Sequence, residues 1–173
     1  MKLVFPGSFD PITKGHLDIA LRGAKLAGTV IIAVFDNPAK RTLFTVDERL
    51  RLMSEAIAEV SVDTVRFEFD SFNGLLAEYV RKNSVTAIIR GLRSPSDFEA
   101  ELPYSIHNRN LSGGVDTLYF ASDPEYSHIS SSIVKEIASH AIGNGFGAEE
   151  LVSLVPGCVF EALKKKYSKK VEG

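Results

Sequence analysis

Short apolar runs alternate with longer segments of helical periodicity along almost the whole chain, and this alternation limits the possible folds more than any other feature. The runs are rich in Val, Ile and Phe and cover residues 3–5, 29–35, 64–69, 85–89 and 115–121. Near-continuous apolar runs are typical of strands that are buried on both faces. Right-handed crossovers through helices join such strands in parallel. We therefore predict a doubly wound α/β fold with a five-stranded parallel sheet and helices on both faces.

The segments between the runs carry helix signals. Residues 17–24 keep an apolar stripe, and Gly28 stands where a C-terminal cap is expected. Thr45 and Glu48 match a capping box, and Ser94-Pro95 places a proline in a first helical turn. Further helices are predicted near residues 76–80, from residue 94 onward and near residues 129–137, with a helical extension over about residues 148–170. No linker or repeat interrupts the pattern, so we expect one Rossmann-like domain over residues 1–173.

Polar residues of one chemical type follow several of the predicted strands. In a doubly wound sheet, ligands bind at the carboxyl ends of the strands, near the point where strand order reverses. His16 begins a helix after the first strand, Lys40 follows the second, and Arg90 and Arg93 follow the fourth. A serine-rich helix start at residues 126–132 follows the fifth, where backbone N–H groups and the helix dipole favour an anion. Each feature alone is typical of a cap or a solvated loop, but together they predict a site for a triphosphate.

Composition and missing motifs exclude several other classes. Cys158 is the only cysteine, which excludes a disulfide framework and multi-cysteine zinc sites and favours a reducing compartment. No apolar stretch is long enough to span a bilayer, and the N-terminus lacks a signal-peptide core. A formal net charge of −2 disfavours nucleic acid as a partner. The chain has no Walker motif, dinucleotide fingerprint or Gly-x-Ser-x-Gly elbow, and no metal site is predicted within the protein. We expect a cytoplasmic protein with no membrane partner.

Two motifs resemble the signatures of the nucleotidyltransferase superfamily. Residues 7–16 end in Thr13-Lys14-Gly15-His16, which resembles its Thr/His-x-Gly-His motif, and residues 129–135 resemble its Ile-Ser-Ser-Ser-x-x-Arg/Lys motif. Within the superfamily, Arg90-Gly91-Leu92-Arg93 followed by Asp97, Glu101 and Asn108-Arg109 is similar to bacterial phosphopantetheine adenylyltransferases. The similarity spans roughly residues 3–140.

The resemblance implies transfer of AMP from ATP to 4′-phosphopantetheine by direct in-line attack, which gives dephospho-coenzyme A and pyrophosphate, with Mg²⁺ accompanying ATP. It implies that three residues are catalytic: His16, Lys40 and Arg90. The residues that it assigns to ATP are Ser8, Phe9, His16, Gly91, Leu92, Arg93, Glu101, Tyr126, Ser127, His128, Ile129, Ser130, Ser131 and Ser132. The residues that it assigns to phosphopantetheine are Ser8, Lys40, Leu76, Arg90, Tyr104 and Asn108.

The resemblance also implies a homo-hexamer and feedback by coenzyme A. Two alternatives stay open: another acceptor, nicotinamide mononucleotide or glycerol phosphate, or a non-catalytic nucleotide-binding module. Enzymes for both other acceptors usually carry His where this chain has Thr13. The chain departs from the family pattern at Tyr126 and His128, in the length of residues 141–155 and at Pro103, which is expected to bend or end its helix.

Overall fold

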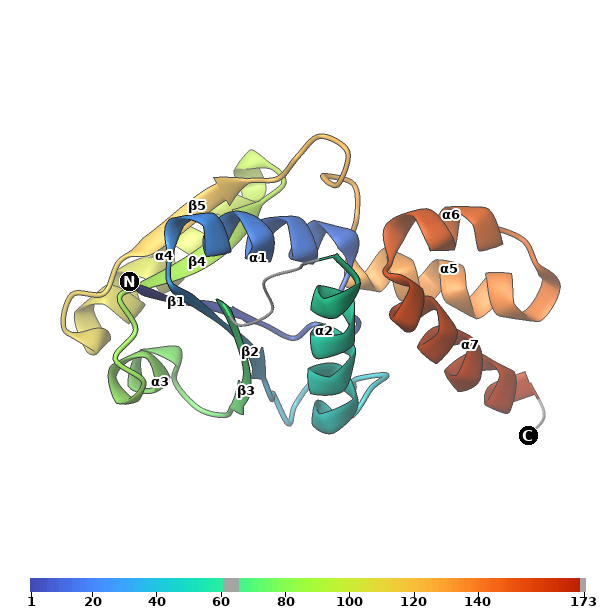
Figure 1. Ribbon diagram of the computed structural model, residues 1–173, viewed down its shortest axis with the longest axis horizontal. Coiled ribbons are helices and arrows are strands. Elements are labelled where there is room, and N and C mark those ends of the chain that lie inside the picture. Colours follow the sequence, from blue (N-terminus) through green and yellow to red (C-terminus); the bar gives the residue numbers. More distant parts are fainter. Residues whose placement is uncertain (61–65, 172–173) are drawn as a thin grey trace.

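The computed structural model describes residues 1–60 and 66–171, which form five strands and seven helices (Figure 1). The strands are β1 (Lys2–Gly7), β2 (Thr29–Phe35), β3 (Phe67–Phe72), β4 (Ala87–Leu92) and β5 (Thr117–Ala121). The helices are α1 (Lys14–Leu26), α2 (Val46–Val60), α3 (Leu76–Lys82), α4 (Pro95–Ser112), α5 (Ser131–Asn144), α6 (Ala148–Leu154) and α7 (Gly157–Val171).

The sheet has the order β3-β2-β1-β4-β5, and all four neighbouring pairs are parallel. This confirms the predicted five-stranded parallel sheet. Strand order reverses between β1 and β4, so the edge at their carboxyl ends is the expected place for a ligand. Of the five predicted strands, the third, residues 64–69, differs most from the strand in the structure, β3. Residues 64 and 65 lie outside the described part of the chain, and β3 continues to Phe72, where it pairs with Phe35 at the end of β2.

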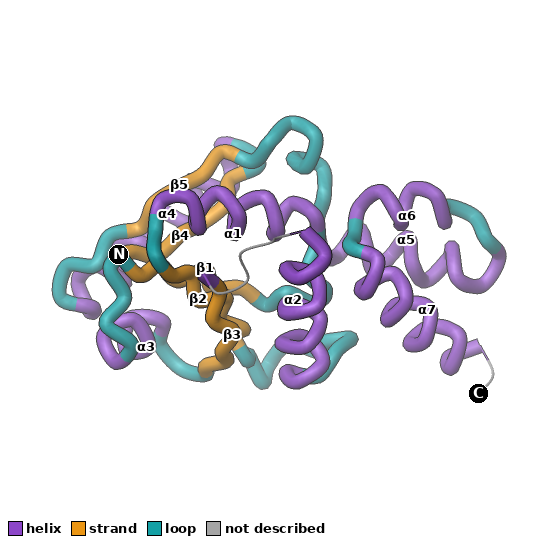
Figure 2. The backbone as a smooth tube through the Cα atoms, in the orientation of Figure 1, coloured by secondary structure: helices purple, strands orange, loops and turns teal. Residues whose placement is uncertain are grey.

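Helices cover both faces of the sheet, as predicted (Figures 1 and 2). On one face, Leu3 and Val30 are buried in a core that includes residues from α1, α2, α5 and α7. On the other face, Val4 and Ile31 are buried with residues of α3, such as Val80. Neighbouring positions of a strand point to opposite faces, so a run of apolar residues such as those of β1 and β2 fills both cores.

The ends of the helices follow the sequence signals with one exception. The capping box at the start of α2 is confirmed: the Thr45 N–H donates to Glu48 Oε2 (2.8 Å) and the Glu48 N–H donates to Thr45 Oγ1 (3.2 Å). The prediction that Gly28 caps α1 is wrong. The cap is Ala27, with an extended backbone (φ −130°), and the Gly28 N–H donates to the Met1 carbonyl at 3.1 Å. The chain enters β2 directly, so no left-handed glycine is needed there.

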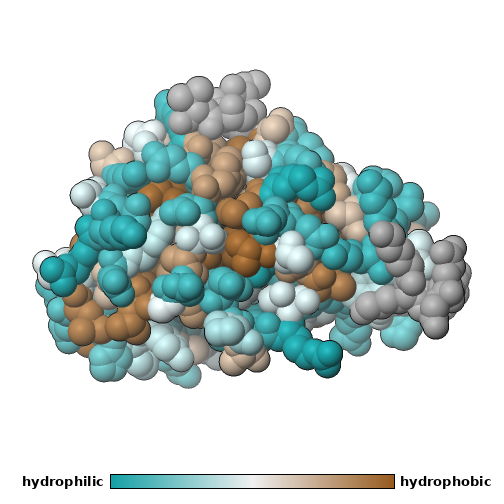
Figure 3. Space-filling model, turned by 90° about the horizontal axis from the view of Figure 1, so that it is seen from below, coloured by the Kyte–Doolittle hydropathy of each residue, from teal (hydrophilic) through white to brown (hydrophobic). Residues whose placement is uncertain are grey.

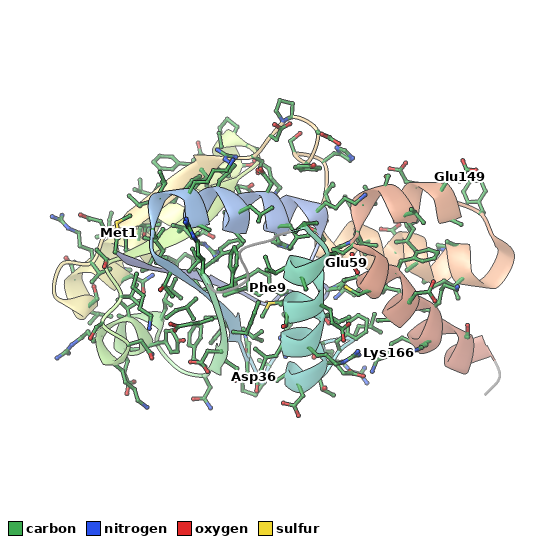
Figure 4. The ribbon with its side chains drawn as sticks, in the orientation of Figure 1. Met1, Phe9, Asp36, Glu59, Glu149 and Lys166 are labelled. Atoms are coloured by element: carbon green, nitrogen blue, oxygen red, sulfur yellow. The ribbon has the colours of Figure 1, made fainter. Side chains whose placement is uncertain are left out.

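Helices α5, α6 and α7 pack beside the sheet layer at the C-terminal end of the chain (Figure 1). Helix α7 lies against α2, and Glu59 and Lys166 mark this boundary in Figure 4. The Glu59 carboxylate accepts the N–H groups of Gly157 (2.9 Å) and Cys158 (2.7 Å) in the first turn of α7. Further along α7, Lys166 Nζ binds Glu48 Oε2 at 2.8 Å. These contacts tie the C-terminal helices to the helix that follows β2.

Helix α4 covers the β4 side of the second face and runs through Pro103 without ending. Of the two expected effects, a bend or an end of the helix, the second does not occur at this proline. Proline removes the hydrogen bond to the carbonyl four residues earlier, here that of Glu99, which is an exposed residue. The helix exposes several large apolar side chains, namely Phe98, Leu102, Tyr104, Ile106 and Leu111.

Hydrophobic patches also lie between hydrophilic residues on the face of the molecule in Figure 3. Among the described residues, no helix is both long and apolar enough to cross a membrane.

Candidate active site

Two neighbouring pockets open at the carboxyl ends of β1 and β4, where the topology places a ligand site. The first has a volume of about 410 Å³ and the second about 390 Å³. Their linings share five residues at the boundary: Pro6, Gly7, Ser8, Arg90 and Glu101. The two pockets therefore form one site with two compartments, which join at the carboxyl ends of β1 and β4.

Most of the residues expected to bind the nucleotide line the first pocket. They are Ser8, Phe9, His16, Gly91, Arg93, Glu101, Tyr126, Ile129, Ser130, Ser131 and Ser132, and Lys40 and Arg90 lie with them. Three predicted residues lie outside this lining. Leu92 ends β4, His128 is exposed, and Ser127 Oγ donates to the Pro124 carbonyl at 3.0 Å.

The second pocket collects the remaining acceptor-side residues. Leu76, Tyr104 and Asn108 line it together with Ser8 and Arg90, although they come from different elements of the chain. Lys40 lies in the first pocket and not in the second. The two aromatic rings of Phe35 and Phe72 also line the second pocket and make it the more apolar of the two.

Residues 7–9 take a tight path from β1 into the site. Phe9 has a left-handed backbone (φ 45°), a conformation that costs a non-glycine residue of the order of 1–3 kcal/mol. Its ring packs edge-on against Phe5 and His16, each at 5.2 Å between centroids, and lies in the core near α2 in Figure 4. A Cβ on Gly7 would lie 2.9 Å from the Phe9 ring, so the close packing of this turn requires glycine at position 7.

His16 is held in one orientation by the start of α1. The Thr13 N–H donates to His16 Nδ1 at 3.1 Å, and Thr13 Oγ1 accepts the His16 backbone N–H at 3.4 Å, which together form a capping box. Because Nδ1 accepts a backbone proton, we assign the proton of the neutral ring to Nε2. Burial, with smaller effects from Arg93 and Arg90, lowers the pKa of His16 to about 4. At neutral pH, His16 is therefore an uncharged N–H donor.

Both arginines of the Arg90-Gly91-Leu92-Arg93 group line the pocket, and both are paired with carboxylates of α4. Arg90 binds Glu101 in a bidentate ion pair through Nε and Nη2, and its Nη1 donates to the Pro6 carbonyl at 2.6 Å. Arg93 binds Asp97 through Nε (3.1 Å) and Nη2 (3.2 Å). The pairs fix the planes of both guanidinium groups before a ligand arrives.

A third ion pair joins the two sequence motifs. Lys135 Nζ lies 2.9 Å from Asp10 Oδ2, and Asp10 is only 2% exposed. Burial opposes ionisation of Asp10, but the bonds from Lys135 and from the N–H groups of Leu43 and Phe44 lower its pKa below the usual value. Lys40 differs from the other cations: its Nζ lies 3.4 Å from Ser8 Oγ, and no carboxylate of the described residues binds it.

The serine hydroxyls at the start of α5 have structural partners. Ser130 caps the helix by accepting the Ile133 N–H at 3.2 Å, and Ser131 Oγ donates to the Pro11 carbonyl at 2.8 Å. The second bond holds the N-terminus of α5 against the residues before α1. The backbone N–H groups of this first turn thus stay close to the first pocket, which Ser130, Ser131 and Ser132 line.

Sequence reasoning missed Arg49, Asp10 and Lys135 as parts of the site. Arg49 is 1% exposed, and its Nη1 donates to the Ser8 carbonyl at 3.0 Å. A signal for Arg49 was available, because it stands four residues before Met53 on the apolar stripe of α2, where an arginine has to find buried partners. Lys135 and Asp10 stand within the two motifs, but their pairing across 125 residues follows only from the fold.

Comparisons with known proteins identify the family of the chain. The cytidylyltransferase-like family model matches residues 4–137. The phosphopantetheine adenylyltransferase of Caldanaerobacter subterraneus subsp. tengcongensis is 45% identical over 96% of this chain and 97% of its own length. The enzyme of the same name from Geobacter metallireducens is 46% identical over 96% of this chain and 95% of its own length.

Solved structures support the fold at a greater distance. A bifunctional NMN adenylyltransferase/ADP ribose pyrophosphatase from Francisella tularensis superposes with a TM-score of 0.69 at 15% identity, and the match covers 99% of this chain and 52% of that longer one. The family model covers most of the chain, and the two relatives match it over nearly their full length. The chain therefore belongs to the cytidylyltransferase-like family and, within it, to the phosphopantetheine adenylyltransferases.

Proposed function

We propose that this chain transfers AMP from ATP to 4′-phosphopantetheine and releases dephospho-coenzyme A and pyrophosphate. The observation that carries the proposal is the meeting of two pockets at Ser8, Arg90 and Glu101, with His16 in the first and Leu76 in the second. A nucleotide in the first pocket and an acceptor in the second would bring their phosphates to this boundary. Holding two reactants in this way supplies a large part of catalysis, because a bimolecular step becomes effectively unimolecular.

The proposed reaction needs no enzyme nucleophile. An oxygen of the acceptor phosphate forms a bond to the α-phosphorus of ATP while the bond from that phosphorus to the bridging oxygen breaks, and pyrophosphate leaves with the electron pair. His16 Nε2–H would donate to an α-phosphate oxygen as charge builds up in the transition state. Lys40 and Arg90 would hold the attacking phosphate, since Lys40 contacts Ser8 and Arg90 lines both pockets.

We propose that Mg²⁺ accompanies ATP and is held mainly by its phosphates. In the ranges that the structure describes, no cluster of three His, Cys, Asp or Glu side chains could form a protein cage for a metal. The three carboxylates that line the first pocket, those of Asp10, Asp97 and Glu101, each bind a cationic side chain. This donor set fits a magnesium ion that keeps its waters and takes most of its ligands from the nucleotide. When bound, the ion would neutralise charge on the β- and γ-phosphates.

An acceptor panel tests the proposal. ATP or CTP is offered with phosphopantetheine, nicotinamide mononucleotide or glycerol phosphate, and pyrophosphate release and the nucleotidyl product are measured. We expect turnover with ATP and phosphopantetheine only. Turnover restricted to either of the other acceptors, or nucleotide binding without turnover, would reject the proposal in favour of one of the two alternatives.

We also propose a cytoplasmic homo-hexamer that is subject to feedback by coenzyme A. The free thiol of Cys158 supports the cytoplasmic location. The apolar side chains that α4 exposes, such as Leu102 and Ile106, support the hexamer, because a neighbouring copy could cover them. Light scattering tests the hexamer. Inhibition by coenzyme A, measured while each substrate is varied in turn, tests the feedback.

A further inference from the structure

Two buried charged side chains, Asp10 and Arg49, tie the loop that carries Lys40 to the segment that carries Ser8. The loop, residues 36–45, joins β2 to α2. Asp10 and Arg49 are 2% and 1% exposed, respectively. The reaction proposed above gives neither of them a contact with substrate, so their buried charges require another explanation.

Asp10 holds the end of the loop. Its Oδ1 and Oδ2 accept the Leu43 N–H at 3.1 and 3.0 Å, and its Oδ1 also accepts the Phe44 N–H at 2.9 Å. Lys135 Nζ lies 2.9 Å from Asp10 Oδ2 and balances the charge of the carboxylate. Hydrogen bonds from a backbone N–H to a carboxylate are about twice as strong as those between neutral groups, so this bond set fixes residues 43 and 44 firmly.

Arg49 connects the loop to Ser8. Its Nη1 donates to the Ser8 carbonyl at 3.0 Å, its Nε donates to the Thr45 carbonyl at 3.4 Å, and its Nη2 lies 3.4 Å from Asp36 Oδ1. One planar guanidinium thus contacts the first and last residues of the loop and the backbone of Ser8. Figure 4 marks Asp36 near the end of β2, where the loop begins.

The contacts of Asp10 and Arg49 fix both ends of the loop, at residue 36 and at residues 43–45. Residues 37–42 connect these two fixed points, and Lys40 lies in the middle of them. Lys40 is exposed, yet its Nζ reaches Ser8 Oγ at 3.4 Å. A lysine side chain has about 2 kcal/mol of rotamer entropy, so a lysine on an untethered loop would spend little time at one point. Ser8 is therefore held through its carbonyl by Arg49 and is contacted through its hydroxyl by Lys40.

We propose that Asp10 and Arg49 are positioning residues that hold Lys40 at the pocket boundary, ready for the acceptor phosphate. This inference rests on the proposed function, in which Lys40 binds that phosphate. A displacement of about 1 Å can cost on the order of 10²-fold in rate, so loss of either tie should act mainly through Lys40.

A double-mutant cycle tests the proposal. Asp10→Asn keeps the shape of the side chain but removes its charge, and Arg49→Lys keeps the charge but cannot contact three groups at once. Each is made in the wild-type and Lys40→Ala backgrounds, and kcat and KM are measured for ATP and for phosphopantetheine. The matched controls are Asp116→Asn and Arg51→Lys, exposed residues whose ion pairs lie outside both pockets.

We expect each tie variant to lower kcat/KM for phosphopantetheine by about 10- to 10²-fold in the wild-type background and by less than about threefold when Lys40 is already alanine. Losses that multiply fully with that of Lys40→Ala would overturn the proposal, and so would a Lys40→Ala variant with unchanged turnover. A wild-type chain that transfers no AMP to phosphopantetheine would instead reject the proposed function.

Amide hydrogen exchange without substrates gives a readout that does not depend on the reaction. Asp10→Asn should speed exchange at the Leu43 and Phe44 amides, while Asp116→Asn should not. Unchanged exchange at both amides would also overturn the proposal. The two tie variants are assayed separately, so that one variant that does not fold still leaves the other as a test.

Discussion

Replacing His16 with alanine is expected to lower turnover by about 10²- to 10³-fold. This is the typical loss when one preorganised donor to developing charge is removed, and it corresponds to about 2.7–4 kcal/mol of transition-state stabilisation. Two features of the structure favour the full effect. The ring packs edge-on against Phe9 at 5.2 Å between centroids, and Thr13 fixes the ring through Nδ1. A donor that is already oriented needs no reorganisation during the reaction.

The same geometry predicts how His16 responds to pH. With a pKa of about 4, the imidazole of the free enzyme stays neutral from pH 6 to 9 and carries its proton on Nε2. In the unfolded chain, His16 has an ordinary pKa near 6.5, so between about pH 6.5 and pH 4 it binds a proton that His16 of the folded chain does not bind. The free energy of unfolding should therefore fall as the pH drops from about 6.5 to about 4, and His16→Ala should lack this part of the slope.

Single-turnover measurement of AMP transfer in wild type and His16→Ala tests the magnitude, with His140→Ala on the exposed side of α5 as the control. Nitrogen NMR of the imidazole in the free enzyme tests the protonation state. Turnover of His16→Ala within about threefold of wild type would refute the donor role. A ring that is cationic at pH 7, or that carries its proton on Nδ1, would refute the structural reasoning behind that role.

Three further outcomes are expected. Lys40→Ala should weaken binding of phosphopantetheine more than binding of ATP in calorimetry, because Lys40 lies at Ser8 on the pocket boundary; equal losses would contradict that division. Glu59→Ala should lower the free energy of unfolding in urea by about 1 kcal/mol, a typical value for a lost helix cap, whereas Glu55→Ala should change it less. Cys158 should react slowly with iodoacetamide at pH 8, because burial and Glu59 raise its pKa to about 12; rapid alkylation of the folded protein would argue against this environment.

The sequence predicts the fold well because its signals are local. The apolar strands and the capping box at Thr45 depend on residues close together in the chain, and both are found in the structure. Gly28 misleads because its C-cap role depends on the path that the chain takes after α1, and here that path is already the next strand. Pro103 does not end α4, although proline removes one hydrogen bond from a helix interior.

The candidate site is only partly predictable for the same reason. The two motifs and the polar residues at the strand ends indicate the residues that line the pocket, but not the partners that orient them. Arg49 and Ser8 are 41 residues apart, and Lys135 and Asp10 are 125 apart. Neither spacing belongs to a helix or a turn, so the contacts exist only once the sheet has brought the segments together. Residues that orient other site residues through such long-range contacts are therefore the hardest part of an active site to predict from a single sequence.

The charges of the first pocket argue for a cation that arrives with the nucleotide. Four cationic side chains line it, those of Lys40, Arg90, Arg93 and Lys135, against the three carboxylates that bind the last three. With His16 neutral, the described lining has a net charge of +1. A phosphate monoester alone has a charge of about −1.5 to −2 at pH 7, and a triphosphate adds more. The ion pairs therefore orient donors but cannot balance two phosphorylated substrates, and the remaining charge is what the proposed magnesium ion would supply.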